Sequence, residues 1–102
     1  MAVRHIRASS GFGVTVSDAE ILAAEKELAR LTGVFAEPSG AASYAGLLRL
    51  LEEGKVARDE RVVLLVTGSG LKSIDAVVEE AGSVVPVAKG AEGMEMVEKV
   101  VR

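Results

Sequence analysis

The sequence predicts an α/β fold in which helices pack on a small, largely parallel sheet. Apolar residues make up 49% of the 102 residues and aromatic residues only 3%, so the core must be aliphatic. Aliphatic runs are typical of parallel strands that are buried on both faces. Short β-branched runs also alternate with longer segments of helical periodicity, as in α/β chains. The length fits a single α/β domain over residues 1–102.

The first predicted elements are a short strand and a capped helix. Gly13–Ser17 is β-branched and predicts the strand. Ser17 and Glu20 form a capping-box pattern at the start of a helix expected from about Asp18 to Thr32. Gly33 then suits the left-handed residue that ends many helices. The apolar face of this helix consists of Ile21, Ala24, Leu28 and Leu31.

A second helix is predicted from Pro38 to a stop at Gly54. Proline suits the first helical position because its missing amide hydrogen would be unpaired there. The first half of this helix is unusual in having almost only small residues, namely Ser39, Gly40, Ala41, Ala42, Ser43, Ala45 and Gly46. Such a run lets another backbone or a flat ligand come close. The free amides of a helix start also favour an anion or a polar ligand edge, although tight helix packing explains the same residues equally well.

The remaining elements complete a predicted β-α-α-β-α-β-α order. Val62–Val66 is a continuous apolar run and predicts a buried, central strand. A short helix over Ile74–Ala81 and an edge strand at Val84–Val87 follow, the latter because Pro86 removes a ladder donor. A last helix carries Met94, Val97 and Val101 on one face and runs to Arg102.

The strongest local motif is the turn TGSGLK, Thr67 to Lys72, directly after the predicted central strand. Ligands of open α/β sheets bind beyond the carboxyl ends of strands. Glycines free backbone amides there, and the hydroxyls of Thr67 and Ser69 can donate to a heteroatom. An ordinary turn between a strand and a helix is the alternative. The motif is neither a P-loop nor a dinucleotide fingerprint, because its glycine spacing fits neither.

Composition excludes several classes of function. The formal net charge of −3 argues against nucleic acid and anionic membranes as partners. The absence of cysteine rules out disulfides and thiolate metal sites and is compatible with a reducing cytoplasm. No apolar run approaches the length of a membrane span. The only histidine, His5, has no metal-ligand spacing to other residues, so we expect no metal site.

Three consecutive stretches resemble threonine synthase: VTVSDAEILAAEKELARLTGVFAEPSGAAS, YAGLLRLLEEGK and DERVVLLVTGSGLK. The chain is similar to the C-terminal portion of this fold-type II pyridoxal-phosphate enzyme, which converts O-phosphohomoserine to threonine. The resemblance implies that Thr67 hydrogen-bonds the pyridine nitrogen of the cofactor and that Gly68 and Gly70 let the backbone approach the ring. It also implies that Glu37, Ser39, Gly40, Ala41 and Ser69 line the cofactor pocket.

Two departures from the threonine synthase pattern shape the expected function. Ser69 stands where many family members have histidine. The Schiff-base lysine and the glycine-rich phosphate loop of the family lie upstream of the matching region, and neither is present here. We therefore expect a cytoplasmic enzyme fragment that is inactive alone and assembles as a homo-oligomer or with a complementing N-terminal enzyme fragment. The alternatives are a stand-alone anion-binding or regulatory α/β module and an oligomeric interaction protein.

Overall fold

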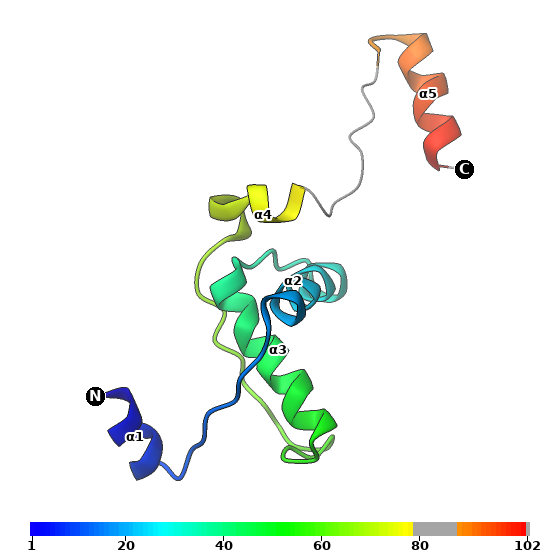
Figure 1. Ribbon diagram of the computed structural model, residues 1–102. Coiled ribbons are helices and arrows are strands. Elements are labelled where there is room, and N and C mark those ends of the chain that lie inside the picture. Colours follow the sequence, from blue (N-terminus) through cyan, green and yellow to red (C-terminus); the bar gives the residue numbers. More distant parts are fainter. Residues whose placement is uncertain (79–87, 102) are drawn as a thin grey trace.

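Two helices, α2 and α3, pack against each other at the centre of the molecule (Figure 1). The computed structural model describes residues 1–78 and 88–101. Two further helices lie towards the chain ends, and a 3₁₀ turn and a short helix lie after the central pair. In chain order the elements are α1 (Ala2–Ala8), α2 (Asp18–Thr32), α3 (Pro38–Glu52), η1 (Gly70–Ser73), α4 (Asp75–Val78) and α5 (Ala91–Val101).

Helix α2 has the bounds that the sequence predicts, and its capping box is formed. The Ser17 amide donates to Glu20 Oε2 at 2.7 Å, and the Glu20 amide donates to Ser17 Oγ at 3.3 Å. At the other end Gly33 adopts a left-handed φ of 75°. The helix therefore begins and ends where its own residues satisfy the terminal backbone groups.

Helix α3 also forms as predicted and packs on α2 through small side chains. Pro38 occupies its first turn, and Gly54 follows its end with a φ of 68°. Polar contacts also join the helices. The Tyr44 hydroxyl donates to Glu27 at 3.2 Å, and Arg49 forms an ion pair with Glu20. Among the residues whose burial the structure describes, the buried apolar ones are mostly alanine: Ala24, Leu28, Ala36, Ala41 and Ala45.

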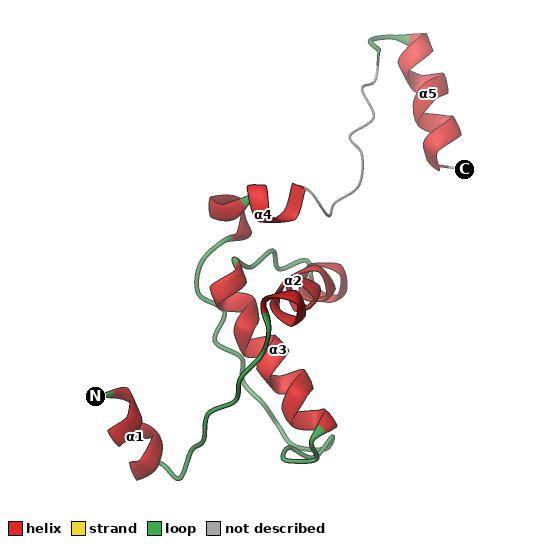
Figure 2. Ribbon diagram, viewed as in Figure 1, coloured by secondary structure: helices red, strands yellow, loops and turns green. Residues whose placement is uncertain are grey.

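The predicted α/β fold with its β-α-α-β-α-β-α order is wrong. The described residues contain helices and loops but no strand (Figure 2), and their one β-bridge is an isolated antiparallel pair, Ala36 with Ser69. The two segments predicted as strands, Gly13–Ser17 and Val62–Val66, are extended, but neither pairs with a neighbouring strand among the described residues. A β-strand needs such a neighbour because its backbone groups form hydrogen bonds across the sheet. Val63 is 82% exposed, so this run is not a buried central strand. The predicted edge strand Val84–Val87 lies outside the described residues.

The C-terminal helices agree with the sequence in part. The segment predicted as one helix over Ile74–Ala81 begins with η1, and α4 then covers Asp75–Val78, where the described stretch ends. Helix α5 corresponds to the predicted last helix. No helix among residues 1–78 and 88–101 is long and apolar enough to cross a bilayer.

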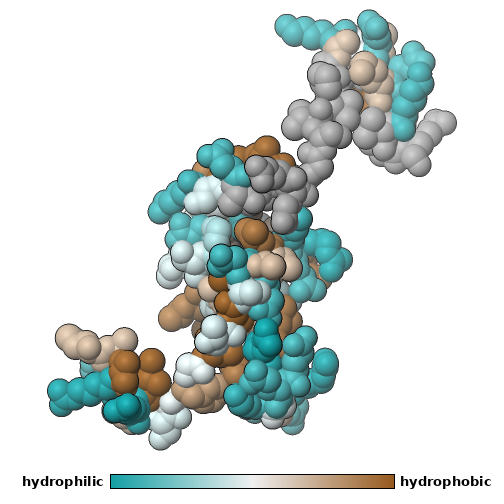
Figure 3. All heavy atoms as spheres, viewed as in Figure 1, coloured by the Kyte–Doolittle hydropathy of each residue, from teal (hydrophilic) through white to brown (hydrophobic). Residues whose placement is uncertain are grey.

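The molecule is elongated and buries little apolar surface. Its principal extents are 63 × 29 × 19 Å and its radius of gyration is 18.6 Å, whereas a compact domain of this length has a radius of about 13 Å. Leu28 is the one large apolar side chain among the hydrophobic residues that are buried in the described part of the chain. Hydrophobic residues reach the surface of the central part of the molecule (Figure 3).

Candidate functional site

The two sequence motifs that predict a site lie against each other. The start of α3 and the segment before it contact the turn Thr67–Gly70 through the backbone. The Gly70 amide donates to the Phe35 carbonyl at 3.0 Å, and the Glu37 amide donates to the Gly68 carbonyl at 3.2 Å. The Ala36–Ser69 bridge lies between these two hydrogen bonds. The turn is therefore fixed on the helix start although the two are some thirty residues apart in sequence.

Gly40 explains how the backbone of the turn comes so close to α3. A Cβ at this position would lie 3.1 Å from the Thr67 carbonyl oxygen and 3.4 Å from the Thr67 nitrogen. Gly40 is buried, and Ala41 beside it belongs to the core that faces α2. The small residue at Gly40 thus allows close packing against the backbone of the turn, and the small residue at Ala41 allows close packing towards α2. Ser39 is exposed at the first turn of the helix.

The two glycines of the turn are covered by side chains of the segment before α3. A Cβ on Gly68, whose φ is 96°, would lie 2.1 Å from Glu37 Oε1. A Cβ on Gly70 would lie 2.5 Å from the ring of Phe35. Both glycines therefore make room for this chain's own side chains. Phe35 and the position of the Glu37 carboxylate were not predicted, because a glycine in a sequence shows that space is needed but not what fills it.

The hydroxyl groups of the turn differ in their hydrogen bonding. Ser69 Oγ accepts from the Leu71 amide at 3.3 Å and caps η1, so its proton remains available for donation. Thr67 is exposed, and its hydroxyl makes no hydrogen bond with any other residue in the described part of the chain. Thr67 is thus an exposed residue, and the backbone around it is held by the hydrogen bonds of Gly68 and Gly70 and packs closely against Gly40.

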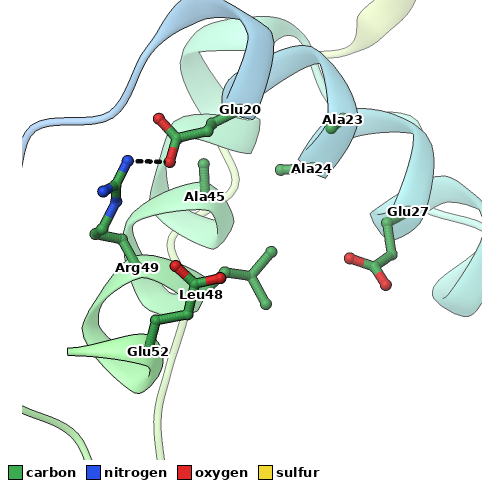
Figure 4. A pocket seen from close by; sticks show the side chains of 8 residues that line it. All are labelled: Glu20, Ala23, Ala24, Glu27, Ala45, Leu48, Arg49 and Glu52. Atoms are coloured by element: carbon green, nitrogen blue, oxygen red, sulfur yellow. Dashed lines mark hydrogen bonds and ion pairs between the residues drawn. The ribbon is translucent and has the colours of Figure 1, made fainter. Parts of the chain in front are cut away.

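A separate cleft of about 140 Å³ lies between α2 and α3 (Figure 4). It is lined by Glu20, Ala23, Ala24, Glu27, Ala45, Leu48, Arg49 and Glu52. The pKa of Glu20 is lowered, first by hydrogen bonds from the Ser17 backbone and side chain and then by Arg49. The cleft shares no residue with the turn, and three of its charged residues, Glu20, Glu27 and Arg49, take part in polar contacts between the two helices.

A family model matches the part of the chain that holds α2, α3 and the beginning of the turn. The family model described as "Pyridoxal-phosphate dependent enzyme" matches residues 1–68, which include α2, α3, Thr67 and Gly68. Pyridoxal phosphate is the cofactor that this family implies.

The curated relatives are threonine synthases of much greater length. The chain is 51% identical to threonine synthase of Methanocaldococcus jannaschii over 77 residues, which are 76% of this chain and 19% of the relative. It is 49% identical to that of Mycobacterium tuberculosis strain H37Rv over 86 residues, which are 84% of this chain and 24% of the relative. The chain thus spans about a fifth to a quarter of these relatives. It belongs to the pyridoxal-phosphate-dependent enzyme family and is similar there to a segment of threonine synthase.

Proposed function

We propose that this chain supplies one side of a pyridoxal-phosphate pocket in an enzyme of the threonine synthase type, and that it is inactive without the rest of that pocket. The observation that carries the proposal is Thr67, an exposed residue whose hydroxyl makes no hydrogen bond with any described residue. The backbone beside it is fixed on α3 through Gly68 and Gly70. A preorganised polar group on a rigid support is what orients a bound cofactor.

The residues of the turn fit the ring side of the cofactor. Thr67 offers a neutral hydroxyl that donates a hydrogen bond to an aromatic nitrogen, and the partly free Ser69 hydroxyl lies two residues further on. Glu37 and Phe35 occupy the space over Gly68 and Gly70, so approach to the ring falls to the side chains of Thr67 and Ser69. The proposed contact with the cofactor therefore involves only the side chains of Thr67 and Ser69 and not the two glycines of the turn.

The chemistry divides between cofactor and protein. Pyridoxal phosphate acts as an electron sink when it is bound. Thr67 would orient the ring and, as a neutral partner, would leave its nitrogen largely unprotonated, whereas a carboxylate at this position would favour a proton there. The Ser69 hydroxyl is too weak a base at neutral pH to replace a histidine as a general acid or base. Thr67 and Ser69 would therefore help to bind the cofactor and to set the protonation of its ring nitrogen, and they do not form a complete catalytic site.

The parts of the pocket that this chain does not offer would come from a second polypeptide segment. The five lysines of the sequence lie outside the Ser-x-Lys context expected for Schiff-base formation, and Lys72 belongs to η1. The relatives are four to five times longer than the matched region. We propose that a complementing enzyme segment brings the lysine and the phosphate-binding loop to the Thr67 turn.

Complementation tests the proposal. The full chain is refolded together with the M. jannaschii threonine synthase chain from which the matching region has been deleted, pyridoxal phosphate is added, and the complex is separated by gel filtration. We expect cofactor absorbance to travel with the complex. Thr67→Val removes the hydroxyl with little change of shape and should weaken cofactor retention about tenfold, the effect of losing a hydrogen bond worth ~1.4 kcal/mol.

Thr15→Val is the matched control, because Thr15 is also exposed and lies in the extended segment before α2. The control should retain the cofactor as the unmodified chain does. Retention that is the same with Thr67→Val, or a complex that carries no cofactor, would contradict the proposal.

A further inference from the structure

We draw no further inference here: the strongest candidate, the acidic cleft between α2 and α3, carries nothing because Glu20 and Glu27 already contact Arg49 and Tyr44 and nothing else in the described part of the chain points to a ligand there.

Discussion

Gly68 is the residue on which the geometry of the turn most depends. Its φ of 96° is one that residues with a Cβ rarely adopt, and a Cβ added to it would overlap the Glu37 carboxylate. Its carbonyl also accepts from the Glu37 amide. Any side chain here must therefore both strain the backbone and displace Glu37.

We expect Gly68→Ala to destabilise the chain by about 2 kcal/mol, the sum of backbone strain and displacement of Glu37. Gly54→Ala is the matched control, because Gly54 has a φ of 68° and nothing within 4 Å of an added Cβ. It should cost about 1 kcal/mol from strain alone. Urea unfolding followed by circular dichroism measures both, and an equal loss in the two variants would contradict the contact with Glu37.

Glu20 makes the stability of the helix pair depend on pH. Its carboxylate accepts from the Ser17 amide and hydroxyl, both at 2.7 Å, and pairs with Arg49. These contacts favour the charged form and hold the pKa of Glu20 below its ordinary value of 4.5. The contribution to stability is therefore complete above pH 4.5 and is lost as the pH falls through the lower pKa of the folded state.

We expect the urea midpoint to fall as the pH is lowered from 6 to 3 and the fall to be shallower in Glu20→Gln. Glu52→Gln serves as control, because Glu52 lines the same cleft without a hydrogen bond to Ser17. The control should keep the full pH dependence. Identical pH profiles for the unmodified chain and Glu20→Gln would show that this capping box and ion pair do not carry the effect.

The residues of the turn were predicted more completely than their surroundings. The sequence pointed to Thr67–Gly70 and to the small residues after Glu37, and the structure brings the two together. It could not show that Phe35 covers Gly70 or that Ser69 caps η1, because these contacts depend on the path of the chain in space. The spacing of glycines indicates where the backbone needs freedom or space, but it does not show which residue occupies that space.

At the level of elements, α2 and α3 were predicted well because their signals are local, whereas α1 (Ala2–Ala8) has no place in the predicted order. The capping box of Ser17 and Glu20, the left-handed Gly33 and the proline at Pro38 all lie in the chain beside the helix ends they define. The strand predictions were wrong because a strand depends on a partner that is distant in sequence. An apolar run such as Val62–Val66 indicates extended backbone, but a sheet also needs a neighbour, and local periodicity says nothing about one.

The contact between α2 and α3 can be followed through Tyr44, the only tyrosine. Burial raises the pKa of its hydroxyl, and the hydrogen bond to Glu27 and the charge of that carboxylate raise it further. We expect ultraviolet titration of the phenol to show a pKa above 10.0 in the unmodified chain and a lower one in Glu27→Gln. An unchanged titration in Glu27→Gln would mean that α2 and α3 are not joined by this bond in solution.

At the scale of the whole molecule, shape and sequence identity lead to the same interpretation. The radius of gyration of 18.6 Å shows that the chain is not compact. Its alanine-rich core buries too few large apolar side chains to hold the elements together more tightly. Apolar residues nevertheless make up 49% of the chain. A chain with this composition and this few buried side chains is suited to packing within a larger assembly. The similarity to a fifth to a quarter of threonine synthase supports the same proposal.

The most direct test of the central claim is phosphate release from O-phosphohomoserine in the presence of pyridoxal phosphate. The chain alone should release phosphate no faster than the free cofactor does, because under the proposed function it would supply the Thr67 side of the pocket without the lysine and phosphate-binding parts. The complex with the M. jannaschii chain lacking its matching region should release it at a higher rate, and Thr67→Val should lower that rate. Release by the isolated chain above the cofactor background would contradict the account.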